Sequence, residues 1–185
     1  MMGRSAGPRP RYRVHQFLQA AAAWLTPPSA VELATARCCL PAAAWEMFRA
    51  LPRSDQHHGL QVLRALTAAG HRHVALCQAA LLHDCAKHAG GLRLWHWAAV
   101  VLLAAVRPAY LAGLAGAAEP SAGDWRRPFW VHANHAQQGA ELAAAAGCDP
   151  CAVELIRRHQ DRPAPTGDPS FDKLLAALQA ADDDH

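Results

Sequence analysis

Apolar residues recur along most of the chain at spacings of three and four, the period of an amphipathic helix, and Pro and Gly residues interrupt the pattern. No segment alternates convincingly between apolar and polar positions at the period of a strand. We therefore expect an all-α fold, built as a helical bundle. The pattern predicts helices at residues 11–25, 29–38, 41–50, 55–69, 73–88, 94–116, 132–146, 149–160 and 170–182.

Several of these helices start with residues that cap helix N-termini. Ser29 has Glu32 three residues later, which is the spacing of a capping box. Ser54 directly precedes the helix predicted at 55–69. Asp149 is followed by Pro150, a residue favoured in the first helical turn.

The most apolar stretch covers residues 94–116, but it does not have the pattern of a membrane span. A spanning helix needs about 20 consecutive apolar residues. Here His96, Arg107 and Pro108 interrupt the run. We expect a buried or interfacial helix and no membrane span, with association at a membrane surface left open, followed by a surface loop at residues 119–128.

The composition favours helices and a single domain with an N-terminal extension. Of the 185 residues, 52% are hydrophobic and 18% charged, and Ala is abundant while Val and Ile are few. We expect an arm and accessory helices in residues 1–50, packed on a main bundle in residues 51–185. The net charge of +3 owes much to the arm, which contains Arg4, Arg9, Arg11 and Arg13. A solvated tail is the favoured interpretation of the arm, and no stable nucleic-acid complex is expected.

The six cysteines favour reduced thiols and a cytoplasmic protein. Adjacent Cys38 and Cys39 do not form an ordinary disulfide. The segment Cys148–Cys151 has the CxxC spacing of a redox or zinc pair, but the strand context of a redox motif and a suitable second pair are both missing. Two ordinary thiols at the start of a helix is the better interpretation.

Histidine and aspartate residues near the ends of separate predicted helices are the candidates for chemistry. If the bundle brings these helix ends together, they form a nitrogen and oxygen ligand set that suits Fe, Mn, Co, Ni or Zn, as one ion or two. For His83 and Asp84 taken alone, a buried hydrogen-bonded pair is an equally good interpretation. His57 and His132 are expected to be exposed or to support the ligands. The candidate metal ligands are His58, His83, Asp84, His135, His159 and Asp182.

Four segments of the sequence resemble the HD superfamily of metal-dependent phosphohydrolases. "HHGLQV" resembles the helix with the first histidine of that family, and "AALLHDCAK" is similar to its "AALLHDIGK". "HAQQGAEL" resembles the "HPxxGAxL" helix of the binuclear members, and "LIRRHQD" resembles the helix that supplies a further histidine. The resemblance covers residues 54–183.

The resemblance implies an HD-domain bundle with a binuclear centre. One metal would be held by four residues, and Asp84 would bridge to a second metal on His135 and His159; the first four are His58, His83, Asp84 and Asp182. Asp84 and Lys87 would be the catalytic residues, with Lys87 near a substrate phosphate. The implied reaction is hydrolysis of a nucleotide or dinucleotide phosphate ester or anhydride by a metal-activated water.

The sequence departs from one subfamily and leaves a second function open. In HD-GYP phosphodiesterases a second histidine and a GYP element follow the last histidine, whereas here Gln160 follows His159 and the GYP element is missing. HD-type diadenosine tetraphosphate hydrolases share the order of the ligands. The alternative to an enzyme is a non-catalytic HD-like module that binds a nucleotide or a protein; the retained ligand set favours the enzyme. The oligomeric state is open.

Overall fold

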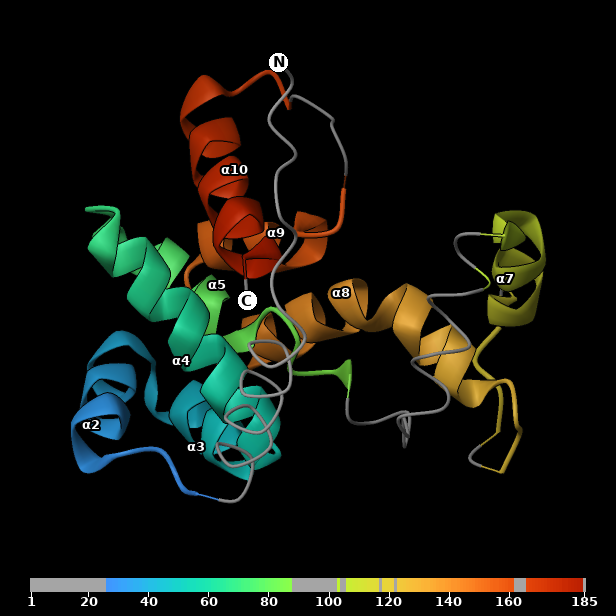
Figure 1. The fold of residues 1–185 in the computed structure, drawn as a ribbon, viewed down its shortest axis with the longest axis horizontal. Helices are drawn as coiled ribbons and strands as arrows, with labels where there is room; N and C mark the ends of the chain where they lie inside the picture. Colours follow the sequence, from blue (N-terminus) through green and yellow to red (C-terminus); the bar gives the residue numbers. More distant parts are fainter. Residues whose placement is uncertain are drawn as a thin grey trace, which may run out of the picture.

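The computed structural model describes residues 26–87, 103, 106–116, 118–121, 123–161 and 166–184, without the side chains at 108, 112 and 115. These residues form eight helices and no strand, so the expected all-α fold class is confirmed. The helices, labelled as in Figure 1, are α2 (Ala30–Cys39), α3 (Ala42–Ala50), α4 (Arg53–Ala68), α5 (Val74–Leu82), α7 (Pro108–Ala115), α8 (Arg127–Ala145), α9 (Pro150–Arg158) and α10 (Pro169–Asp183).

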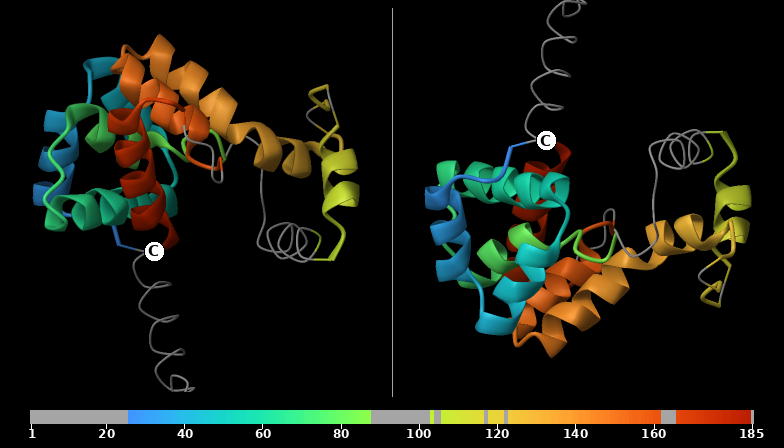
Figure 2. Two further views of the ribbon diagram at one scale, coloured as in Figure 1. Left: turned by 90° about the horizontal axis from the view of Figure 1, so that it is seen from above. Right: turned by 90° about the horizontal axis from the view of Figure 1, so that it is seen from below.

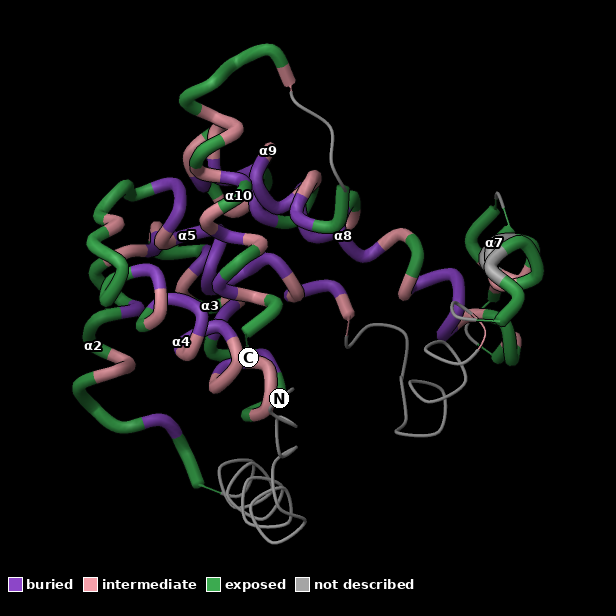
Figure 3. Tube along the Cα trace, turned by 45° about the horizontal axis from the view of Figure 1, so that its top comes forward, coloured by how far each residue is buried: buried purple, intermediate pink, exposed green. Residues whose placement is uncertain are grey.

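Helix α5 lies at the centre of the bundle and packs against α2, α4, α9 and α10. Its sequence VALCQAALL has one polar residue, and seven of its nine residues are buried. A short helix without a polar face can only be placed where it is surrounded on all sides. Figure 3 shows the burial of α5 together with the inward faces of α4, α8 and α9.

The side chain of Gln78 in α5 links two segments that are distant in sequence. Its Nε2 donates to the carbonyl of Cys39 at 3.1 Å, and its Oε1 accepts from the amide of Asp149 at 2.9 Å. The end of α2 and the start of α9 are therefore fixed to the same residue of the central helix. Gln78 is buried, so both bonds are protected from water.

Helix α7 and the first turns of α8 lie outside the bundle, as the views in Figures 1 and 2 agree. Helix α8 begins at Arg127 with Pro128 in its first turn, five residues before the expected start at 132, and the predicted loop at 119–128 therefore ends two residues early. Proline is preorganised for this position, so it starts the helix here instead of breaking it. None of the described helices is long and apolar enough to cross a membrane.

The helix starts and ends test the predictions from capping residues. The capping box of Ser29 and Glu32 is present, and the Asp149 side chain accepts from the amide of Cys151. The expectation for Ser54 is wrong: α4 begins at Arg53, and the Ser54 hydroxyl donates to the Asp55 carboxylate. Pro52 precedes the helix and sets its start two residues earlier than expected.

Three further predictions have mixed outcomes. Helix α5 ends at Leu82, so the expected end at residue 88 is wrong and residues 83–86 form turns. The predicted helix at 11–25 lies outside the described residues, as do residues 94–102, 104 and 105 of the helix predicted at 94–116, whose described part contains α7. All six cysteines are free, in agreement with the expectation of reduced thiols.

Candidate metal centre

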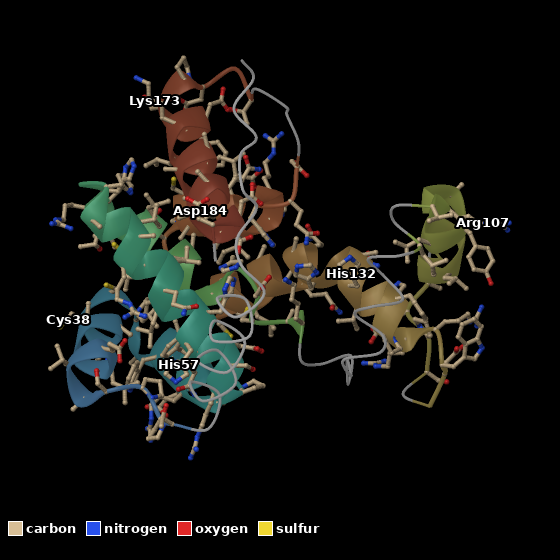
Figure 4. The ribbon with its side chains drawn as sticks, in the orientation of Figure 1. Cys38, His57, Arg107, His132, Lys173 and Asp184 are labelled. Carbon is tan, nitrogen blue, oxygen red and sulfur yellow. The ribbon has the colours of Figure 1, made fainter. Side chains whose placement is uncertain are left out.

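The six predicted ligands converge on one place from five parts of the fold. His58 lies in α4, His135 in α8 and Asp182 in α10, while His83 with Asp84 follows α5 and His159 follows α9. Figure 4 labels Asp184, two residues beyond Asp182, at the end of α10 near the middle of the bundle, and it labels His132 on α8. His135 does not open its helix as expected, because α8 starts earlier and places it in the interior.

Four of the residues form a first cluster, which we call site A: His58, His83, Asp182 and the Oδ2 atom of Asp84. The Nε2 atoms of His58 and His83 are 3.2 Å apart. Asp182 Oδ1 lies 2.9 Å from the His58 nitrogen and 3.2 Å from the His83 nitrogen. Asp84 Oδ2 lies 3.9 Å and 3.6 Å from the same two nitrogens.

The other oxygen of Asp84 faces a second cluster, which we call site B: His135, His159 and the Oδ1 atom of Asp84. Oδ1 lies 3.4 Å from Nε2 of His135 and 3.6 Å from Nε2 of His159. The two imidazoles are buried, with His135 fully buried and His159 4% exposed, while the Asp84 side chain is 15% exposed. Asp84 therefore belongs to both sites, one oxygen to each.

Backbone carbonyls orient three of the imidazoles. In His83, His135 and His159, Nδ1 lies within hydrogen-bond distance of the carbonyl three residues earlier, at 3.2, 2.7 and 2.7 Å. A carbonyl can only accept, so each Nδ1 carries the proton and each Nε2 presents a lone pair to the cluster. This is the arrangement in which a histidine binds a metal through Nε2.

Lys87 places a positive charge against site A. Its Nζ lies 2.6 Å from Oδ2 of Asp84, the oxygen that faces His58 and His83. The pair follows the i,i+3 spacing within the turns after α5. Lys87 thus contacts the oxygen of Asp84 that belongs to site A.

Burial and charge act against each other on the acidic groups. Burial alone would raise the pKa of Asp84, but the imidazoles of His83, His135 and His159 and the ammonium of Lys87 outweigh it and hold the pKa well below its usual value. Burial likewise opposes ionisation of Asp182, whose pKa is nevertheless lowered by hydrogen bonds with His58 and His83. Both carboxylates are ionised at neutral pH, as metal ligands must be.

Burial and the nearby carboxylates shift the pKa values of two imidazoles in opposite directions. Burial disfavours the charged form of His83, but the carboxylates of Asp84 and Asp182 prevail and raise its pKa. In His159 burial prevails over Asp84, and the pKa is lowered. The surroundings thus favour the charged form of the His83 imidazole and disfavour the charged form of the His159 imidazole.

Two buried atoms at the centre have no hydrogen-bond partner, and both point to a cation. Among the described residues, Asp84 Oδ1 and His159 Nε2 are buried and unpaired. Unpaired buried polar atoms are costly, and a cation between them would satisfy both. Ligand atoms ~2.1 Å from one cation are about 3.0 to 3.4 Å apart, close to most of the separations in sites A and B. The donor set therefore fits one or two metal ions, and each cluster could hold one.

Two residues around the centre were not predicted as parts of it. Gln160 places its Nε2 3.2 Å from Nε2 of His135. Gln179 in α10 donates to the carbonyls of His159 and Asp161, at 3.1 and 2.6 Å, and fixes the turn after α9. The sequence carried no signal for Gln179, whereas the place of Gln160 directly after a predicted ligand was a usable signal.

The two histidines expected in supporting positions differ from each other. His132 supports the site through its carbonyl, which accepts from Nδ1 of His135, and burial with the nearby charges of His135 and Lys87 lowers its own pKa to about 4. His57 is directed away from the site: its Nε2 lies 2.7 Å from the carbonyl of Thr26.

Comparisons with known proteins do not assign a role to the site. No family model, no curated protein and no solved structure matches the chain.

Proposed function

We propose that the protein is a metal-dependent phosphohydrolase of the HD type that hydrolyses a phosphate ester or anhydride bond of a nucleotide or dinucleotide. One observation carries the proposal: Asp84 gives one oxygen to each of two imidazole clusters, with 3.6 Å or less to an imidazole nitrogen on both sides. A carboxylate shared in this way is suited to hold two cations side by side.

The chemistry requires cations in both sites. When bound, they would lower the pKa of a water molecule to near neutrality and offset the charge that develops on the phosphoryl oxygens. His58, His83 and Asp182 would hold one cation, His135 and His159 the other, and Asp84 both. Lys87 would turn its ammonium from Asp84 toward a phosphoryl oxygen and add a positive charge there.

No protein nucleophile is needed, and the thiol nearest in sequence is not suited to be one. Cys85 follows Asp84 directly, but its thiol is buried and lies 3.9 Å from the carbonyl of Gly139. Burial, with the negative charge of Asp84, raises its pKa to about 12. A thiol in this state does not attack phosphorus at neutral pH, which favours water as the nucleophile.

The residues of the proposed centre coincide with those that carry the resemblance to the HD superfamily. That resemblance, and the order of the ligands along the chain, support a nucleotide or dinucleotide as substrate. The choice among Fe, Mn, Co, Ni and Zn is open to experiment, since imidazole and carboxylate ligands accept all of them.

The test is hydrolysis of a panel of nucleotides and dinucleotides, followed as release of phosphate from nucleotides and of mononucleotides from dinucleotides, by protein stripped of metal and reloaded with Mn, Fe, Co, Ni or Zn. His58→Ala is expected to lower the rate at least about 100-fold, because it removes a metal ligand. His57→Ala is the matched control, since His57 is the preceding residue and its imidazole contacts Thr26 instead of the site. Metal binding without hydrolysis of any substrate would overturn the proposal and favour the non-catalytic binding module.

A further inference from the structure

The two sites have unequal numbers of protein ligands. Each site has one oxygen of Asp84 and two imidazole nitrogens as candidate ligand atoms. Site A has a fourth, Oδ1 of Asp182, which lies 2.9 and 3.2 Å from its two imidazole nitrogens, whereas site B has three. Metals that take five or six ligands would bind more weakly at the poorer site. A further polar atom close to site B is therefore of interest.

Gln160 supplies such an atom. Its Nε2 lies 3.2 Å from Nε2 of His135, which is the separation expected between two ligands of one cation. Nδ1 of His135 donates to the carbonyl of His132, so its Nε2 is an acceptor and Gln160 is the donor of this bond. The amide side chain is thus directed at the nitrogen that would bind the metal.

A cation at His135 would break this hydrogen bond. The Gln160 amide would then favour its oxygen, and no longer its nitrogen, facing His135. The lone pair of His135 Nε2 would be used by the cation, and the amide nitrogen of Gln160 would face a positive charge. A half turn about the last side-chain bond exchanges Nε2 for Oε1, an oxygen that can bind a cation. No backbone movement is needed.

The backbone of Gln160 is held in place from both sides. Gln179 in α10 donates through its one amide group to the carbonyl before Gln160 and to the carbonyl after it, those of His159 and Asp161. The side chain of Gln160 is exposed, so core packing does not dictate its direction. Its approach to His135 therefore comes from this anchored turn and from the attraction between the two groups.

We propose that Gln160 is the fourth protein ligand of site B and binds the second cation through its amide oxygen. The proposal rests on the metal-dependent function proposed above and assigns a role to a residue outside the predicted ligand set. The amide oxygen adds a neutral ligand, so the charge at site B stays with the shared carboxylate of Asp84.

The test counts the cations bound by the full chain, with Mn²⁺ as the probe in equilibrium dialysis and with electron paramagnetic resonance to detect a coupled pair. The variants are Gln160→Leu, which removes the oxygen at similar size, and Gln160→Glu, which replaces the amide by a carboxylate. Gln137→Leu is the control, because Gln137 is exposed on α8 and bonds to Glu141 and Arg157, away from the site.

We expect two Mn²⁺ ions in the parent protein and in the control. Gln160→Leu should bind the first ion as the parent does, with about 10-fold or more lower affinity for the second ion and loss of the signal from the coupled pair. Gln160→Glu should bind the second ion at least as tightly as the parent. These results would support the assignment without any measurement of activity.

Other results would overturn it, and they separate this proposal from the proposed function. If the parent binds two ions and hydrolyses nucleotides while Gln160→Leu binds both ions equally well, the ligand role is wrong and the enzymatic function stands. Slower hydrolysis in Gln160→Leu with unchanged binding would also refute the ligand role. A parent that binds no ion, or only one, would refute it as well, and a parent that binds none would overturn the metal-dependent function too.

Discussion

At the scale of single residues, Asp84 determines how the two sites depend on each other. Its Oδ2 faces site A and its Oδ1 faces site B, and the rest of each site comes from different helices. Within the part of the chain that the structure describes, the Asp182 carboxylate pairs with the two imidazoles of site A and with none of site B. The two aspartates should therefore differ in what their loss removes.

Asp84→Asn is expected to abolish the binding of both cations. Asp182→Asn should abolish binding only at site A. Asparagine keeps the shape of each side chain but removes the charge that binds the metal. The number of Mn²⁺ ions per chain measures the difference, and exposed Asp184, changed to Asn, is the control. If both variants lost the same number of bound Mn²⁺ ions, the assignment of Asp182 to a single site would be contradicted.

Lys87 should affect cation binding and hydrolysis in opposite directions. Its ammonium occupies a place 2.6 Å from Oδ2 of Asp84 and competes with a cation for that oxygen. Lys87→Gln is expected to bind the cation at site A several-fold more tightly and to hydrolyse substrate at least about 10-fold more slowly, because a charge near the phosphoryl oxygens is lost. Calorimetric titration and kcat measure the two effects. A decrease in both would show that Lys87 supports the metal instead of competing with it.

At the scale of helices, Gly59 sets how closely α4 approaches the end of α5. A Cβ atom added at Gly59 would lie 3.1 Å from the carbonyl oxygen of Leu81 and 3.2 Å from that of Ala80. Both neighbours are backbone atoms and cannot turn aside. His58 precedes this glycine and His83 follows Leu82, so the contact fixes the distance between two ligands of site A.

Gly59→Ala is expected to destabilise the protein by about 1–3 kcal/mol, because α4 must move away from α5. The same movement should weaken cation binding at site A. Gly113→Ala in α7 is the control: a Cβ there meets nothing within 4 Å, and the helix propensity of alanine should leave the stability unchanged or raise it by up to about 1 kcal/mol. Urea unfolding and Mn²⁺ titration test both variants. A tolerated Gly59→Ala with normal cation binding would show that this contact does not position His58.

The sequence predicted helices better than it predicted where they end. Apolar periodicity located each helix that lies wholly in the described residues, and the capping signals of Ser29 and Asp149 were correct. The end of α5 was missed because Cys85 and Ala86 are apolar and buried in turns, so their pattern resembles a continuing helix. The early start of α8 was missed because Pro128 suggested a loop, although proline also suits a first turn.

The site was predicted through residue types and not through geometry. Histidines and aspartates in recognisable segments pointed to the candidate ligands, and the six lie together. No feature of the sequence indicated that one oxygen of Asp84 would face each cluster. That arrangement depends on how α8 and α9 pack beside the end of α5. Backbone carbonyls, such as that of Ile156 beneath His159, carry no sequence signal at all.

At the scale of the whole molecule, pH should change the stability of the metal-free protein through Asp182. The pKa of Asp182 is lowered from an ordinary value of 3.8, so its contribution is present above about pH 4 and is lost as the pH falls further. The pKa of His83 is raised from 6.5, partly by Asp182, so this contribution is present below about pH 6.5 and is lost as the pH rises.

The stability difference between the parent and Asp182→Asn is therefore expected to be largest between about pH 4 and 6.5. It should decrease as the pH falls below about 4, because the Asp182 carboxyl of the unfolded chain then becomes protonated while the folded one stays ionised. It should also decrease as the pH rises above about 6.5, through the raised pKa of His83. Urea unfolding of chelator-treated protein across this range provides the measurement. A difference that stays constant from pH 3 to 8 would mean that the contact between Asp182 and the imidazoles has no effect on stability.

The contact between His58 and Asp182 joins residues 124 positions apart in the chain. A ribosome adds about 5–20 residues per second, so on the order of 10 s separates the synthesis of these two residues. The ligands of site B are all made before Asp182 appears. A growing chain therefore carries every side chain of site B before it carries the acid that completes site A.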